Sequence, residues 1–390
     1  MTIGDHLLPS WVDEPESECC EWKRITCSST TGHVSHLFLH NIRNLNTDHY
    51  HDSHYYYHKD VVWVLNAPLF ETFMELKNLN LSLNWIGGWV ENEGSESLLR
   101  LNKLERLDLG SNLFNQNIMQ SLRLLESLKT LNLAANLLEG SFPAEGISIF
   151  EDLEMLDLRY NRLNGSLTVQ ALKYLKLDSN DMEGPFYDQG WEPLIQLDFL
   201  VFSNCYLNYS NQIPTFLLHQ HKLRVLDLSY SYLKLKGPFP GWLLENNTRL
   251  EFVTLNNNFF TSHFHLRPPL NSAYAMDVSN NQLSGQLQGN MGNILPKIRL
   301  LNLSKNAFEG YLPFSIGNKS LLDLLNLSFN NFSGEVPKEL LTGCFQLQIL
   351  DLSNNKFSGH LLSITFNFTK LRVLKINDNQ FSGTRHPNVL

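Results

Sequence analysis

The amino-acid sequence predicts a right-handed α/β solenoid, in which short units repeat along the chain and stack on one another. A parallel β-sheet forms the concave face, and short 3₁₀, extended or helical segments return along the convex side. Three observations predict this fold. The 390 residues include 73 Leu and 42 Asn, far above ordinary usage. One pattern of leucines around an asparagine recurs along the chain, and its spacing is nearly constant.

The repeated pattern is Leu-x-x-Leu-x-Leu-x-x-Asn-x-(Leu/Phe), in which the asparagine is the anchor. It is clearest around Asn112, Asn306 and Asn355. Successive anchors are 19 to 28 residues apart, at positions 84, 112, 136, 161, 180, 205, 231, 258, 281, 306, 330, 355 and 379. A fourteenth, degenerate unit opens the array with Ile42 at the anchor position.

The pattern predicts one short strand and one turn in each unit. The two leucines of Leu-x-Leu point to the same side of a strand, and a single unit cannot bury that side alone. Stacking in a parallel sheet, about 4.8 Å per strand, buries it and gives thirteen units a concave face about 60 Å long. The anchor amide both donates and accepts, so it satisfies backbone groups at the turn. Because Cys205 and Ser231 replace it twice, we expect the ladder to loosen there.

Many units continue after the anchor with a glycine and, three residues later, a proline. Examples are the segments Gly140–Pro143, Gly310–Pro313 and Gly334–Pro337. Glycine allows positive φ, and proline favours an extended or turn conformation. The return path is therefore predicted to consist of short extended pieces and single helical turns.

Charge and hydropathy exclude several other classes of protein. The net charge of −9 and the isoelectric point near 5.9 disfavour a nucleic-acid binder that uses basic phosphate contacts. The longest apolar run, Val61–Leu65, is far shorter than the ~20 residues of a membrane span. No signal peptide is visible at the N-terminus.

With its Leu-x-Gly-x-(Ile/Val)-Pro continuation, the unit resembles the plant-type leucine-rich repeat, over about residues 76–384. The segments Leu8–Trp11 and Cys19–Cys27 resemble the N-terminal cap of that family. Residues 66–94 are similar to plant leucine-rich-repeat receptor-like proteins, which lack a kinase. The predicted organisation is a partial N-terminal cap at 1–31, a degenerate repeat at 32–45, a His/Tyr-rich insertion at 46–65, thirteen plant-type repeats at 66–384 and an uncapped end at 385–390.

The resemblance also implies how the cysteines are used. Cys20 and Cys27 correspond to a cap disulfide that covers the edge of the first strand, whereas Cys19 would pair with a cysteine further upstream. Reduced thiols are the alternative. Cys205 and Cys344 are expected to be buried structural residues.

Asn-x-Ser/Thr sequons are weak evidence for secretion, since the repeat itself spells Leu-Asn-Leu-Ser. The candidate glycosylation sites are Asn80, Asn164, Asn208, Asn246, Asn302, Asn318, Asn326, Asn331 and Asn367.

No catalytic motif or cofactor-binding loop is found, so we predict neither an enzyme nor a cofactor. The aspartates Asp108, Asp157, Asp227, Asp277 and Asp351 all stand between the two inward leucines. They form a line because the repeat does, which argues against a catalytic carboxylate pair.

A dense polar cluster lies in the insertion, and zinc or copper could bind such a set of imidazoles and carboxylates. Because a polar insertion offers little rigid scaffold, we interpret it as a solvated loop and predict no metal site. The cluster comprises Asp48, His49, His51, Asp52, His54 and His58.

The concave face is the predicted ligand-binding surface. In units four to eight its outward positions depart from the Asp-x-Ser-x-Asn of later units and carry residue types that dominate binding energy at interfaces. The candidate residues are Met155, Arg159, Tyr160, Tyr174, Lys176, Phe199, Val201, Tyr230 and Phe252. Packing along the sheet is the alternative, because later units are also apolar here (Leu300, Leu324, Ile349 and Val373).

The resemblance implies an extracellular module of a plasma-membrane receptor-like protein. It would bind a peptide, protein or glycan ligand, without nucleic acid or direct membrane contact, and signal through a co-receptor or adaptor receptor kinase, with defence as the expected role. The absent signal and cap end suggest a fragment, and a chain that ends here would be apoplastic. The alternatives are a secreted inhibitor like the polygalacturonase-inhibiting proteins and a truncated product without independent function. Thirteen units, the insertion and the uncapped end disfavour the inhibitor.

Overall fold

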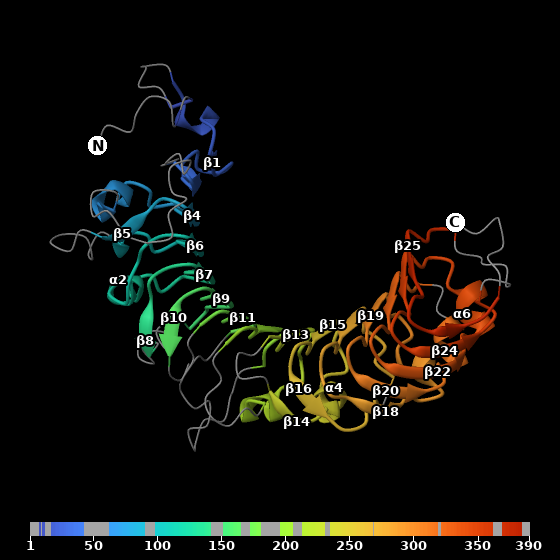
Figure 1. Cartoon of the computed structure of the whole chain (residues 1–390). Coiled ribbons are helices and arrows are strands. Elements are labelled where there is room, and N and C mark those ends of the chain that lie inside the picture. The colour runs from blue at the N-terminus through green and yellow to red at the C-terminus, as the bar shows by residue number, and fades with distance from the viewer. Residues whose placement is uncertain are drawn as a thin grey trace. The chain divides into compact units, whose positions relative to one another are not determined.

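We describe the protein from a computed structural model. It describes residues 8, 10–11, 17–42, 62–89, 98–141, 151–164, 172–180, 196–205, 213–230, 235–267, 269–318, 321–361 and 369–383. The chain divides into two compact units, unit 1 at Met1–Phe186 and unit 2 at Tyr187–Leu390. Each is a solenoid with one strand per repeat on its main sheet (Figure 1), so the predicted fold is confirmed.

The main sheet of each unit follows the order of the chain. In unit 1, β1 pairs with β2 antiparallel, and every later pairing is parallel. The strands of unit 1 are β1 Ile25–Cys27, β2 Val34–Phe38, β4 Asn78–Asn80, β6 Arg106–Asp108, β7 Thr130–Asn132, β9 Met155–Asp157 and β11 Tyr174–Lys176. Those of unit 2, all parallel, are β12 Phe199–Val201, β13 Val225–Asp227, β15 Phe252–Thr254, β17 Ala275–Asp277, β19 Leu300–Asn302, β21 Leu324–Asn326, β23 Ile349–Asp351 and β25 Val373–Lys375.

The return segments are short, as predicted, but their extended pieces also pair into further parallel sheets. These strands are β3 Trp63–Leu65 with β5 Ile86–Trp89, β8 Glu139–Ser141 with β10 Arg162–Asn164, β14 Lys236–Pro238 with β16 Phe259–Thr261, and the series β18 Ser284–Gln286, β20 Ala307–Gly310, β22 Asn331–Glu335, β24 Lys356–Gly359 and β26 Gln380–Phe381. In unit 2 they lie on the side opposite to β15, β19 and β25 (Figure 1).

Single helical turns complete the return path. They are η1 Cys19–Glu21, η3 Ala67–Phe70, α2 Ile118–Leu122, η4 Thr215–His219, α4 Gly241–Asn246, α5 Met291–Ile294, η5 Phe314–Asn318 and α6 Lys338–Gly343. No helix in the described part of the chain is both long and apolar enough to span a bilayer.

The core is a stack of identical layers. The inward leucines are fully buried, for example Leu107 and Leu109 at 2% and 0% exposure. On the return side of unit 2, Phe308, Phe332, Phe357 and Phe381 stack with ring centroids 5.9 to 6.3 Å apart. Gly334 shows why glycine recurs beside them: its φ is +76°, and a Cβ would collide with the Tyr311 ring. Burial in each unit therefore depends on the neighbouring units.

The anchor asparagines form the predicted hydrogen-bond ladder. The Asn355 Nδ2 donates to the carbonyls of Leu327, Leu352 and Ser353 at 2.9 to 3.2 Å, and its Oδ1 accepts the Phe332 amide at 3.1 Å. The residue before every predicted anchor, including Ile42, has φ between +50° and +61°. The side chain thus compensates a left-handed turn that costs energy in each repeat.

At one substituted anchor, Cys205, the backbone bonds to the following repeat can be followed. Cys205 Sγ contacts the Ser203 carbonyl at 3.4 Å, yet the backbone bonds from Phe202 to Asp227 and from Asn204 to Ser229 are 2.8 and 3.0 Å. Backbone pairing to the next strand is therefore kept at this anchor. Ser231 lies outside the described residues.

We expect Asn355→Ala to lower the free energy of unfolding by about 2 to 4 kcal/mol, because it leaves buried backbone groups without partners. Urea unfolding followed by circular dichroism measures the loss, and hydrogen exchange should localise it to the neighbouring repeats. The exposed Asn271→Ala is the control. A loss below about 0.5 kcal/mol for Asn355→Ala would refute the role assigned to the ladder.

Candidate ligand-binding face

One row of outward-facing residues in unit 2 is apolar from the first strand to the last. It consists of the first residue of each main-sheet strand, and we call it the apolar stripe: Phe199, Val225, Phe252, Ala275, Leu300, Leu324, Ile349 and Val373. Each member is in register with the next across the sheet. Successive side chains therefore lie about 4.8 Å apart along one line.

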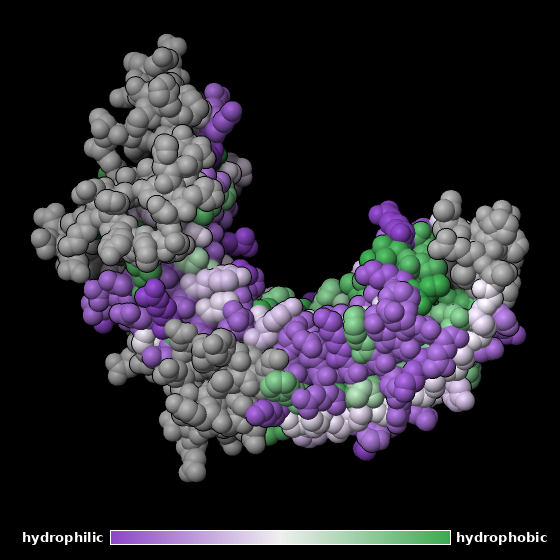
Figure 2. All heavy atoms as spheres, in the orientation of Figure 1, coloured by the Kyte–Doolittle hydropathy of each residue, from purple (hydrophilic) through white to green (hydrophobic). Residues whose placement is uncertain are grey.

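The stripe is at the surface because strand residues alternate between the two faces. The middle residues Leu226 and Val253 are buried at 0% and 1% exposure, whereas Phe252 and Leu300 are 39% and 38% exposed. Hydrophobic surface is visible over β25 and beside β19 (Figure 2). The other members of the stripe are partly buried, and a row of partly exposed apolar side chains is typical of interaction sites in soluble proteins.

Ion pairs border the stripe on the side of the residues that precede each strand. Arg224 pairs with Glu251 at 2.8 Å, and Arg299 pairs with Asp323 at 2.5 Å. Between them, the Tyr274 ring lies 5.3 Å from the Phe252 ring and under the Arg299 guanidinium at 5.4 Å. This border is ordered and close to neutral, so it frames the stripe without giving it a strong charge of its own.

Unit 1 has no such stripe in its described part. Its corresponding positions are mostly polar, running through His36, Asn78, Arg106, Thr130, Met155 and Tyr174 in register. The adjacent row carries paired charges, Lys129 with Glu105 at 3.6 Å and Lys173 with Glu154 at 2.5 Å. The apolar surface is therefore a property of unit 2.

The structure distributes the sequence-predicted binding residues over both units. Unit 1 carries Met155, Arg159, Tyr160, Tyr174 and Lys176, and unit 2 carries Phe199, Val201, Tyr230 and Phe252. Within unit 1, Tyr174 is in register with Met155. Within unit 2, Phe199 and Phe252 are both members of the apolar stripe.

Arg159 is held by a buried carboxylate. Its Nη2 and Nε contact the Asp157 oxygens at 2.8 and 2.9 Å, and the Asp157 side chain is 4% exposed. Hydrogen bonding to Asp157 raises the pKa of Arg159. Lys176 Nζ lies 3.8 Å from the same carboxylate. Both cations therefore neutralise a buried charge within the unit, which limits what either offers a ligand.

Tyr160 and Tyr230 are the most exposed of the predicted residues, at 58% and 57%. Both occupy the left-handed turn before an anchor, with φ of +54° and +53°. Their exposure follows from this turn, in which the side chain projects beyond the end of the strand.

The row that contains Phe199 and Phe252 continues beyond the predicted residues. Leu300, Leu324, Ile349 and Val373, for which packing along the sheet is the alternative, continue in register the partly exposed row of Phe199 and Phe252. In unit 2 the first residue of every main-sheet strand is apolar, and this regularity in the sequence could have identified the whole stripe.

The row of aspartates has a structural role. Asp108, Asp227, Asp277 and Asp351 each accept the amide of the residue two positions later, at 2.9 to 3.1 Å, and asparagines do the same in other repeats. This side-chain turn opens the bend after the strand. It accounts for the line of carboxylates without catalysis.

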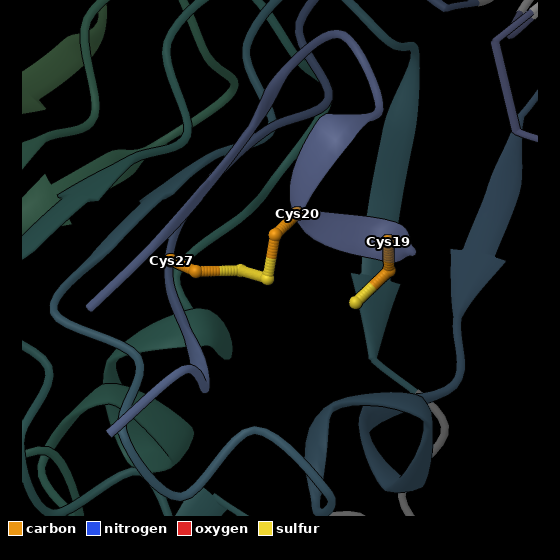
Figure 3. A group of neighbouring side chains, drawn as sticks. All are labelled: Cys19, Cys20 and Cys27. Atoms are coloured by element: carbon orange, nitrogen blue, oxygen red, sulfur yellow. A yellow bond between two sulfur atoms is a disulfide. The ribbon is translucent and has the colours of Figure 1, made fainter. Parts of the chain in front are cut away.

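The cap contains three neighbouring sulfur atoms (Figure 3). Cys20 and Cys27 form a disulfide, with Cα atoms 5.5 Å apart, and Cys19 is a free thiol. The two disulfide sulfurs are not available as thiolate ligands, so this group is not a metal site. Cys205 and Cys344 are buried, at 0% exposure. The His/Asp cluster at 48–58 lies outside the described residues.

Comparison with known proteins agrees with the geometry. The Leucine Rich Repeat family model matches residues 346–368. Receptor like protein 21 of Arabidopsis thaliana is 29% identical over 475 aligned residues, which cover 88% of this chain and 46% of the relative. Receptor-like protein 14 of the same plant is 30% identical, with the same coverage. The chain thus spans about half the length of these curated relatives.

Among solved structures, the Arabidopsis receptor kinase HAESA, in complex with the peptide hormone IDA and the co-receptor SERK1, has a TM-score of 0.75 to this chain. The sequences are 26% identical, and the match covers 96% of this chain and 59% of HAESA. The similarity extends through the repeats that carry the apolar stripe.

We expect Asp108→Asn to stabilise the protein at pH 7 by up to about 1 kcal/mol. Burial raises the pKa of Asp108, so the charged carboxylate destabilises the folded state at pH values above that pKa. Below the ordinary pKa range of carboxyl groups, the side chain is neutral in both the folded and the unfolded state, and this penalty is absent. Asparagine keeps the turn, as Asn132 does. Urea midpoints at pH 7 and pH 3 test this: the gain should vanish at pH 3. Asp351→Asn, which removes a partner of Lys375, should give no gain. A lower midpoint for Asp108→Asn at pH 7 would contradict the assignment.

Proposed function

We propose, from the premise that the chain belongs to the leucine-rich-repeat receptor-like proteins of plants, that it captures an extracellular peptide on the concave face of unit 2. The apolar stripe carries this proposal. It is continuous over the main-sheet strands of unit 2, and its most exposed members, Phe252 and Leu300, lie near one another on that face.

The form of the stripe favours an extended ligand. Its members stand in a line across the strands rather than around a pocket, so a chain lying along the line contacts one side chain per repeat. Extended peptides present side chains alternately on two sides, which allows one set to contact the stripe. HAESA, which is similar in fold, is seen with a peptide hormone and a co-receptor, and this supports the same class of ligand here.

We further propose that the ligand-bound chain recruits a receptor kinase as signalling partner. No kinase motif occurs in these 390 residues, and the curated relatives are named receptor-like proteins. The co-receptor in the HAESA complex is a precedent for such a partner. A role in defence stays a prediction.

Panning random decapeptides against the purified chain tests the binding function. We expect peptides whose affinity falls about tenfold for the double variant Leu300→Ser, Ile349→Ser, because the lost apolar contacts are worth about 1 to 2 kcal/mol. The matched control is Tyr311→Ser, Phe314→Ser, which removes exposed rings (71% and 63%) outside the stripe. Equal loss in both variants, or no selected peptide, would contradict the proposal.

Glycan mapping by mass spectrometry of the secreted chain provides a second test. Asn302 and Asn326 end strands β19 and β21 on the concave face, where their Oδ1 atoms accept bonds from Ser304 and Ser328. Asn246 is exposed at the end of α4, away from this face. We expect a glycan at Asn246 and none at Asn302 or Asn326, because sugars there would cover the stripe. Full occupancy of Asn302 would argue against a ligand on this face.

A further inference from the structure

A second row of side chains runs beside the apolar stripe in unit 2. It is formed by the last residue of each strand, and we call it the polar row: Val201, Asp227, Thr254, Asp277, Asn302, Asn326, Asp351 and Lys375. These residues are in register with one another. Residues two apart on a strand face the same side, about 6.8 Å from each other, so a ligand on the stripe also meets this row.

Two carboxylates in the polar row are held in place and form no ion pair with the residues that the structure describes. Asp227 Oδ1 and Asp277 Oδ1 each accept a serine amide at 2.9 Å. Asp277 Oδ2 also accepts a hydrogen bond from the side-chain Nδ2 of Asn302 at 3.0 Å. Among the described residues, no lysine, arginine or histidine nitrogen lies within 4.0 Å of either carboxylate. Asp351 differs, because Lys375 lies 3.5 Å from it.

The cations on the other side of the stripe are already paired. Arg224 is bonded to Glu251 and Arg299 to Asp323. Within the described part of unit 2, Asp227 and Asp277 therefore have no ion-pair partner at this edge of the apolar stripe, where they lie two strands apart on either side of Thr254. The chain as a whole adds to this field with its net charge of −9.

The length of the stripe limits the ligand. Eight strands at about 4.8 Å span about 34 Å, which an extended peptide covers with about ten residues. The Phe252 ring lies between the strands that carry the two carboxylates, so a cation at this place can also contact an aromatic face.

We propose that the occupant of this face is an extended cationic peptide of about ten residues, with apolar side chains on the stripe and a lysine or arginine at Asp227 and Asp277. The inference rests on the proposed function, to which it adds the charge and the length of the ligand. A second copy of this chain, which is itself acidic, does not supply this complementarity.

Three fluorescent decapeptides test the inference with the full chain. All have leucine at alternate positions, and the other positions are all lysine, all serine or all glutamate. We expect fluorescence anisotropy to show the lysine peptide binding at least tenfold more tightly than the serine peptide, with the glutamate peptide weakest. The preference should shrink as ionic strength rises, because salt screens exposed charges.

The double variant Asp227→Asn, Asp277→Asn should reduce the lysine preference to about twofold or less. Its fold is protected, because Asn302 and Asn326 already make the same turn at equivalent positions. The charge-matched control is Glu309→Gln, Glu335→Gln on β20 and β22, outside the face, which should keep the preference. Loss of the preference in the control, or its survival in the aspartate variant, overturns the inference.

Other outcomes separate this inference from the proposed function. If lysine and serine peptides bind equally, and both weaken with Leu300→Ser, Ile349→Ser, the charge inference fails while peptide binding on the stripe stands. If no peptide binds, or if that variant binds as the unaltered chain does, both fail. Light scattering that shows a dimer dissociated by Leu300→Ser, Ile349→Ser would make a second copy the occupant and overturn both.

Discussion

The hydrogen bonds of the anchor asparagine, which follows the strand in most repeats, are the interaction on which the repeats depend. Every repeat turns through a left-handed residue, which exposes backbone groups that the core cannot hydrate. The anchor amide satisfies those groups and also bonds a carbonyl of the preceding repeat, as Asn355 does with Leu327. A single side chain thereby joins local turn geometry to stacking. It supports the register in which the strands pair, the leucines are buried and the phenylalanines stack.

The same turn also determines which side chains lie on the concave face. Strand residues alternate, so the buried leucines leave two outward rows, and the first of these is apolar throughout unit 2. Five of the eight residues in the second row are Asp or Asn, whose side chains bond the amide two residues later. Except for Asp351, which is 8% exposed, these five side chains remain partly exposed while they bond the backbone. Surface chemistry and folding thus share the residues of the polar row.

Sequence reasoning reached the fold almost completely, because the repeat encodes it directly. Leucine spacing and the anchor predicted the strands, and glycine with proline predicted the short returns. The pairing of those returns into further sheets, such as β18 to β26, was missed because two to five residues without a hydrophobic alternation give no strand signal. The candidate face was harder to define: Tyr160 and Phe252 were both predicted to bind ligand, but the structure places Tyr160 in a left-handed turn and Phe252 on a strand. Nor could the sequence show that Arg159 is bonded to Asp157.

The interchange of Asp and Asn in the polar row has a genetic consequence. Their codons differ by one base, and both side chains make the turn that each repeat needs. A point mutation can therefore change the charge of this surface in a given repeat while the scaffold stays intact. Proteins of this kind could diversify what they recognise through a series of folded intermediates, each altered at a single position.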